Sequence, residues 1–246
     1  EIMNHQFQKL QKIGNFIGKP TFDGRPLYIN SLPKSGTNFI ESVFLEIGYK
    51  RAPCRCIVHD NQSSVIPKPL RSKFYLCHIP EAEMFTDERF QSIFIERRLW
   101  DCLKSYVNYM FIDTRHPISN FIKNSRDLEE SVRQLFLSSV NPNGIALVDE
   151  YLKFYEYGMD HYDMVIDYDL FISGDQFTIE KVSLFLNTDL NKISSSIVSA
   201  LETNSPTKNK GRVRMFENLN HEFLSKLKID VELRVRNLLP NQIVRI

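Results

Sequence analysis

Residues 27–47 read LYINSLPKSGTNFIESVFLEI, and this stretch decides the fold. Residues 27–32 begin with three apolar side chains and follow the turn-forming residues Asp23-Gly24-Arg25-Pro26, a pattern that predicts a buried strand. Residues 38–47 carry apolar side chains three or four positions apart, which predicts a helix. A strand, a short polar loop and a helix in this order form the repeating unit of α/β proteins.

The loop between this strand and this helix has the composition of an anion-binding turn. Gly36 lets the main chain approach an oxyanion closely, and the helix dipole favours negative charge at the start of the helix. Ser35, Thr37 and Asn38 add hydroxyl and amide donors. Lys34 adds a mobile positive charge. The competing interpretation is an ordinary turn in which Ser35 or Thr37 caps the helix.

The order of residues in this loop differs from that of a nucleoside-triphosphate P-loop. Such loops need G-x-x-x-x-G-K-[ST], in which the lysine follows the second glycine and the hydroxyl residue holds Mg²⁺. Here Lys34 precedes Gly36, and no glycine stands at the first position of that motif. We therefore expect an anion loop of another kind.

Strands and helices are predicted to alternate over the first two-thirds of the chain. Apolar runs at 74–77 and 93–95 predict further strands, and residues 164–168 are another strand candidate. Helices are expected from the end of the 93–95 strand to about residue 109 and at 128–139, 144–157, 178–186, 194–203 and 217–238, with irregular or loop segments at 51–72, 117–127 and 204–213. This alternation predicts the α/β class, with a single domain over residues 1–246 and a central parallel β-sheet flanked by helices. Ligands bind beyond the carboxyl ends of such strands.

Composition excludes several classes of protein. Hydrophobic residues make up 42% of the 246, enough for one sizeable core, and 31 basic residues nearly cancel 30 acidic ones. This balance gives no field that would attract nucleic acid. No run approaches the roughly 20 apolar residues of a membrane span, and the first 20 residues lack a signal-peptide stretch. The four cysteines lack metal-ligand spacing. We expect a cytoplasmic protein with no nucleic-acid partner, no membrane span and no metal.

A second junction between strand and helix carries a candidate phosphate-binding pair. Arg97 follows the apolar run at 93–95, and Ser105 stands eight positions later. A guanidinium fork and a hydroxyl can together bind one phosphate. Arg98, the next residue in the sequence, is the alternative to Arg97 as the phosphate-binding arginine.

Two further segments are candidates for the same site. His78 directly follows the strand predicted at 74–77, and we expect it on the same rim of the sheet as Lys34 and Arg97. Lys210 and Gly211 belong to a basic segment ahead of the last predicted helix. That segment is equally well interpreted as a solvated surface.

The first loop resembles the 5′-phosphosulfate loop of the cytosolic-type sulfotransferase family, which is usually P-K-S-G-T-T-W. This sequence has Pro33-Lys34-Ser35-Gly36-Thr37-Asn38-Phe39, with asparagine at the second threonine and phenylalanine at the tryptophan that faces adenine. Arg97 followed by Ser105 is similar to the family's 3′-phosphate motif. In that family the serine also holds the loop lysine away from the donor until an acceptor arrives.

Three weaker likenesses occur in the order the family has them. Cys77-His78-Ile79-Pro80 is similar to the end of K-T-H-L-P, which implies that His78 is the general base, but Leu76 stands at the family's lysine. Tyr168-Asp169-Leu170 resembles a Y-E-D-L segment, for which we expect a packing role. Lys210-Gly211 matches part of R-K-G-x-x-G-x-W.

The last of these segments departs from the family at two positions. Asn209 replaces the arginine and Arg214 replaces the second glycine, while Phe216 stands at the tryptophan. Lys208, Arg212 or Arg214 is expected to supply the missing cation.

The resemblance covers residues from about 27 to 220 and implies a P-loop-like sulfotransferase fold. It implies transfer of a sulfuryl group from 3′-phosphoadenosine 5′-phosphosulfate to a hydroxyl or amine of a small-molecule or glycan acceptor, with 3′,5′-adenosine bisphosphate as product and no metal. The catalytic residues would be Lys34, His78 and Ser105. The donor-binding residues would be Lys34, Ser35, Gly36, Thr37, Asn38, Phe39, Arg97, Ser105, Lys210 and Gly211. The alternatives are a nucleotide-kinase-like phosphotransferase and a non-catalytic protein that binds adenosine bisphosphate.

Overall fold

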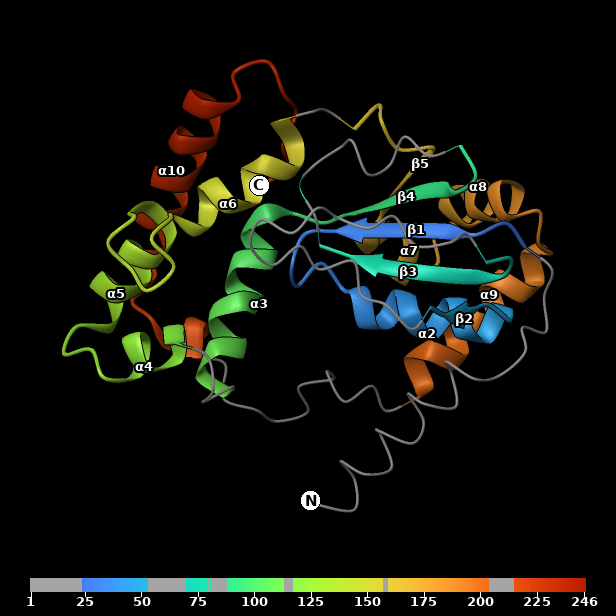
Figure 1. Ribbon diagram of the computed structural model, residues 1–246. Helices are drawn as coiled ribbons and strands as arrows, with labels where there is room; N and C mark the ends of the chain where they lie inside the picture. The colour runs from blue at the N-terminus through green and yellow to red at the C-terminus, as the bar shows by residue number, and fades with distance from the viewer. Residues whose placement is uncertain are drawn as a thin grey trace. The chain divides into compact units, whose positions relative to one another are not determined.

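The computed structural model describes residues 24–52, 70–78, 80, 88–112, 117–156, 159–203 and 215–246 (Figure 1). These residues have an α/β architecture built on a parallel β-sheet flanked by helices, as predicted. They group into two compact units. The sheet unit comprises the described parts of Glu1–Ser31, Gly36–Glu96 and Asp160–Lys208, and the helical unit comprises those of Leu32–Ser35, Arg97–Met159 and Asn209–Ile246. That residues 1–246 form a single domain therefore remains a prediction.

The sheet unit contains a five-stranded sheet in the order β2-β3-β1-β4-β5. Its strands are β1 (Leu27–Ser31), β2 (Lys50–Arg51), β3 (Lys73–Cys77), β4 (Gln91–Glu96) and β5 (Met164–Asp167). Every pairing is parallel, and Ser31 at the end of β1 is in register with Ile95 of β4. The carboxyl ends of all five strands therefore share one edge of the sheet.

One face of this sheet forms the main hydrophobic core. Leu27 and Ile29 of β1 point to this face and are fully buried with alternate residues of β3, β4 and β5. The helices that pack against it are α2 (Thr37–Ile47), α7 (Tyr168–Ser173), α8 (Gln176–Leu186) and α9 (Leu190–Glu202). Full burial of one large apolar side chain such as Phe44 stabilises the fold by about 1.5–3 kcal/mol. The apolar stripes seen in the sequence thus account for the core.

The opposite face of the sheet carries a smaller aromatic cluster. Tyr28 stacks on Phe90 with ring centroids 4.0 Å apart, and Tyr75 meets Phe90 edge-on at 5.4 Å. Asn30 of β1 donates a hydrogen bond to the hydroxyl of Tyr162 at 2.7 Å. Both faces of the central strand are therefore buried, which explains why Leu27, Tyr28 and Ile29 are apolar without alternation.

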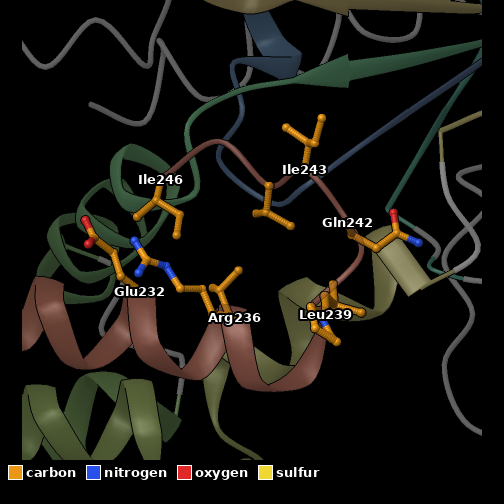
Figure 2. A pocket seen from close by; sticks show the side chains of 9 residues that line it. Glu232, Arg236, Leu239, Gln242, Ile243 and Ile246 are labelled. Carbon is orange, nitrogen blue, oxygen red and sulfur yellow. The ribbon is translucent and has the colours of Figure 1, made fainter.

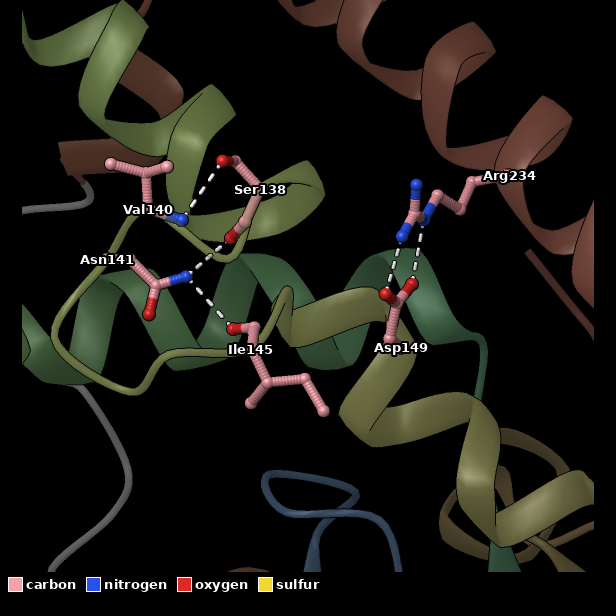
Figure 3. A network of polar contacts seen from close by, with 6 residues as sticks. All are labelled: Ser138, Val140, Asn141, Ile145, Asp149 and Arg234. Carbon is pink, nitrogen blue, oxygen red and sulfur yellow. Dashed lines mark hydrogen bonds and ion pairs between the residues drawn. The ribbon is translucent and has the colours of Figure 1, made fainter.

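The helical unit consists of α3 (Leu99–Ile112), α4 (Pro117–Lys123), α5 (Leu128–Leu137), α6 (Leu147–Glu156), the 3₁₀ helix η2 (Met215–Asn218) and α10 (His221–Leu238). Trp100 of α3 packs edge-on against Phe136 and Phe216. Arg234 of α10 binds Asp149 of α6 through two hydrogen bonds, of 2.7 and 2.5 Å (Figure 3). This paired geometry fixes α10 on α6. None of the helices within the described ranges is long and apolar enough to cross a membrane.

Four element predictions were wrong, each for a local reason. The predicted loop at 117–127 contains α4, because Pro117 occupies the first turn, where a helix tolerates proline. Lys50–Arg51 forms β2, which is too short to show an alternating pattern. Tyr168 begins α7 instead of ending β5, because the carboxylate of Asp167 caps that helix. The helix predicted at 217–238 is divided by Asn220, which caps α10.

Candidate functional site

Three of the predicted site segments follow three neighbouring strands. β3, β1 and β4 lie side by side in the sheet, and their carboxyl ends share one edge. His78 follows β3 directly, the loop from Leu32 to Gly36 follows β1, and Arg97 follows β4. The strand order also reverses around β1, the position at which open α/β sheets bind ligands.

The loop after β1 has the main-chain conformation of an anion-binding turn. Lys34 and Gly36 both have positive φ angles, of 69° and 98°, on either side of Ser35. Turns of this kind direct successive N–H groups toward one point. Gly36 is the N-cap residue of α2 and, within the described residues, no side chain caps this helix. The first turn of α2 also carries no acidic residue, so its positive end remains suited to an anion.

Gly36 is required at its position by conformation and by space. A Cβ atom there would collide with the ring of Tyr168, the first residue of α7. The same tyrosine meets Phe39 edge-on, with ring centroids 6.1 Å apart. The packing role expected for Tyr168 is thus confirmed. Phe39 is partly buried against the main core, and Asn38 beside it is exposed.

His78 is held by the end of the neighbouring strand β1. Its Nδ1 atom lies 2.8 Å from the carbonyl oxygen of Ser31 and 3.3 Å from the Ser31 hydroxyl. A carbonyl oxygen only accepts hydrogen bonds, so Nδ1 carries the proton and donates it. In the neutral ring, Nε2 is then the basic nitrogen. The Ser31 hydroxyl also lies 3.1 Å from that of Thr37, which links the histidine to the first residue of α2.

Lys34 and the preceding residue, Pro33, make three contacts with other residues of the helical unit. Nη1 of Arg97 donates a hydrogen bond to the carbonyl oxygen of Lys34 at 3.0 Å. The hydroxyl of Tyr151 on α6 donates to the carbonyl oxygen of Pro33 at 3.1 Å. The Lys34 ammonium lies over the ring of Tyr109 on α3, 3.1 Å from the ring centroid. Both the main chain and the side chain of Lys34 are therefore positioned by contacts with the helical unit.

Burial keeps the Tyr151 phenol in its donating form. Its side chain is fully buried, and this burial, with the nearby Cys102 and Tyr106, raises the pKa of Tyr151 well above its ordinary value. The phenol therefore stays protonated and continues to donate to the Pro33 carbonyl over the whole physiological pH range.

The hydroxyl of Ser35 is buried inside this loop. The residue has no exposed surface, and no described residue forms a hydrogen bond with its Oγ atom. Leaving a buried hydroxyl unsatisfied costs about 1–3 kcal/mol. A buried polar group without a partner in the protein ordinarily binds a ligand or a water molecule.

The structure separates the roles of the two adjacent arginines. Arg97 binds the loop, whereas Nε of Arg98 pairs with Asp101 at 3.0 Å on the exposed side of α3. Lys104 pairs with the same carboxylate at 2.6 Å. Burial raises the pKa of Asp101, but the hydrogen bond and charge of Lys104 and the charge of Arg98 outweigh it and hold that pKa below its ordinary value. Arg97 is therefore the better candidate of the two.

The remaining predicted residues have other positions. Ser105 is half-buried on α3. Leu76, at the family's lysine position, is buried in the main core beneath the helices, so no cation is supplied from there. Lys210 and Gly211 lie outside the described residues. Across the described ranges, no three His, Cys, Asp or Glu side chains gather as a metal site would require.

Sequence reasoning missed three residues that hold predicted site residues in place. Ser31 was assigned only to the strand, although its place beside His78 follows from parallel pairing. Tyr109 stands four positions after Ser105, and hence on the same face of α3, which was a usable signal. Tyr151 is 118 positions from Pro33 and had no local signal.

A separate hollow of about 340 Å³ lies at the end of α10 (Figure 2). None of the predicted site residues lines it. The lining residues are Glu232, Val235, Arg236, Leu239, Pro240, Gln242, Ile243, Val244 and Ile246. The carbonyl oxygen of Arg245 in this segment accepts a hydrogen bond from the Leu99 N–H at 2.7 Å. The C-terminal segment thus caps the start of α3.

Comparison with models of known protein families and with curated proteins finds no match for this chain.

Proposed function

We propose that this protein is a sulfotransferase that uses 3′-phosphoadenosine 5′-phosphosulfate as donor. The observation that carries the proposal is the hydrogen bond from Arg97 to the carbonyl oxygen of Lys34. The motif that resembles a 3′-phosphate site and the loop that resembles a 5′-phosphosulfate site are physically joined by it. A donor with phosphates at both positions accounts for this pairing better than one with a single phosphate chain.

The loop residues have distinct roles in this proposal. N–H groups at the start of α2 and the buried Ser35 hydroxyl bind oxygens of the 5′-phosphosulfate. The Lys34 ammonium stabilises negative charge that builds on the bridging oxygen. Arg97 binds the 3′-phosphate, with the hydroxyl of Ser105 as its partner on the same phosphate.

His78 acts as the general base. The acceptor oxygen or nitrogen attacks sulfur as the bond from sulfur to the bridging oxygen breaks, and the bisphosphate leaves with that electron pair. Nε2 of His78 takes the proton that the acceptor loses. The hydrogen bond from Nδ1–H to the Ser31 carbonyl supports this role, because it fixes the tautomer with a basic Nε2.

Leu76 favours one alternative, a non-catalytic protein that binds adenosine bisphosphate. Its buried position removes a cation that the family resemblance would lead one to expect. The kinase-like alternative has less support, because Lys34 precedes Gly36 and the loop lacks the P-loop order.

Ligand binding separates these functions. Calorimetry should compare 3′,5′-adenosine bisphosphate, adenosine 5′-phosphate and ATP with Mg²⁺. We expect the bisphosphate to bind at least about tenfold more tightly than the monophosphate, because a charge-assisted contact is worth about 1.5–3 kcal/mol. A preference for ATP that depends on Mg²⁺ would identify a phosphotransferase instead. Tight bisphosphate binding without transfer to any acceptor would identify the non-catalytic protein.

A further inference from the structure

The ammonium of Lys34 lies 3.1 Å from the centroid of the Tyr109 ring, and this contact has no counterpart in the predicted site. We infer that Tyr109 is a positioning residue that holds Lys34 when no donor is bound and releases it to the phosphosulfate. The inference rests on the proposed function, and it gives Tyr109 the role that the family resemblance assigned to Ser105.

The main chain of Lys34 is fixed, so the position of its ammonium depends on the side chain. Arg97 binds the Lys34 carbonyl oxygen and Tyr151 binds that of Pro33, while the φ angle of Lys34 is 69°. The flexible four-carbon stem then selects among partners within its reach. In the structure the Tyr109 ring face is one such partner.

Tyr109 lies one helical turn beyond Ser105 on α3. Residues four apart share one face of a helix, so Ser105 and Tyr109 lie on the same face of α3, and Tyr109 contacts the Lys34 ammonium there. Ser105 is the nearer of the two to Arg97, eight positions from it in sequence. An ammonium over Tyr109 is thus one turn farther along α3 from the predicted 3′-phosphate ligands than one held by Ser105.

The strength of the contact suits a group that must be released. A cation over a partly exposed aromatic ring gains little, whereas an ammonium bound to a phosphate oxygen forms a stronger, charge-assisted hydrogen bond. The Tyr109 side chain is 37% exposed, which leaves the contact partly hydrated. A bound phosphosulfate would therefore take the ammonium from the ring.

The direct test is the chemical shift of the Lys34 side-chain methylene groups, assigned by comparison with Lys34→Arg. The ring face should shift these resonances upfield in ligand-free protein. Saturation with 3′,5′-adenosine bisphosphate should return them to ordinary lysine values. An ordinary shift in ligand-free protein, or an upfield shift that persists in the complex, overturns the inference while the proposed function stands. An unchanged spectrum of the whole protein on addition of bisphosphate overturns the proposed function, and the inference with it.

Two variants test whether Tyr109 holds the Lys34 ammonium or only packs beside it. Tyr109→Leu removes the ring, so bisphosphate should bind about two- to fivefold more tightly, the fold-change that corresponds to an exposed cation–π contact. Tyr109→Phe keeps the ring and should retain both the upfield shift and the original affinity. The partial exposure of Tyr109 makes both replacements compatible with folding, which circular dichroism would check. Weaker binding in Tyr109→Leu, or equal effects of the two variants, contradicts the holding role.

Discussion

Nη1 of Arg97 donates a hydrogen bond to the main-chain oxygen of Lys34 at 3.0 Å. The two residues are 63 positions apart, yet β1 and β4 are neighbours in the sheet, and each residue follows the end of its strand. One guanidinium thus supports the loop directly after β1. The N–H groups of a guanidinium lie in one planar fork, a geometry that suits a phosphate.

Arg97→Ala should weaken binding of 3′,5′-adenosine bisphosphate by at least about tenfold, because it removes charge-assisted hydrogen bonds worth about 1.5–3 kcal/mol. Arg98→Ala is the matched control. Arg98 pairs with Asp101 in an interaction worth about 0–1 kcal/mol, so its loss should change the affinity less than about fivefold. Calorimetric titration checks both variants. Equal effects would show that the guanidinium of Arg97 has no special role.

Gly36→Ala should destabilise the protein by more than the conformational cost alone. A side chain at positive φ costs about 1–2 kcal/mol, and here the new methyl group also meets the Tyr168 ring. Gly174→Ala is a suitable control, because Gly174 has a φ of 82° but no atom within 4 Å of an added Cβ. Urea denaturation should therefore give the larger loss for Gly36→Ala.

The Tyr168 contact can be isolated by a double-mutant cycle. In a Tyr168→Ala background, the cost of Gly36→Ala should fall toward that of Gly174→Ala, because the ring no longer opposes the methyl group. Strictly additive free energies of unfolding would contradict the close packing of Gly36 and Tyr168.

Nitrogen chemical shifts should show that neutral His78 carries its proton on Nδ1. The Ser31 carbonyl oxygen, 2.8 Å away, accepts that proton, which leaves Nε2 as the base. His78→Asn should correspondingly reduce transfer by about 10²–10⁴-fold. A protonated Nε2 and an unprotonated Nδ1 would contradict the hydrogen bond and the assigned role.

Asp101→Asn should lower stability near neutral pH by about 1 kcal/mol or less, as expected for a surface ion pair. The folded-state pKa of Asp101 lies below its unfolded value of about 3.9, so its contribution is present above that pH and is lost as the pH falls through the folded pKa. Urea denaturation between pH 7 and pH 3 should therefore show the difference between variant and parent closing on the acid side. A difference that stays constant to pH 3 would contradict the pairing with Arg98 and Lys104.

Local sequence signals predicted the strand–loop–helix unit and most of the sheet. The apolar residues that bury β1, and those that form the apolar face of α2, are close together in sequence and can be recognised there. They also predicted that Lys34, His78 and Arg97 each follow a strand, and that the carboxyl ends of these parallel strands share one edge of the sheet. They failed for α4, which begins at Pro117 in a segment that was predicted to be a loop, and for β2, which is only two residues long. Tyr109 shares a face of α3 with Ser105 and could have been found from that spacing. The support from Tyr151 depends on tertiary packing and leaves no local pattern.

The most direct test of the sulfotransferase proposal is transfer of label from donor carrying ³⁵S in its sulfuryl group. The protein would be incubated with representative alcohols, phenols, amines and glycans, without metal. We expect label in at least one acceptor class, an equal yield of 3′,5′-adenosine bisphosphate, and loss of both in Lys34→Ala. Lys104→Ala, whose ammonium pairs with Asp101 on α3, should leave transfer intact. Absence of label from every acceptor class, or transfer that survives in Lys34→Ala, would contradict the proposal.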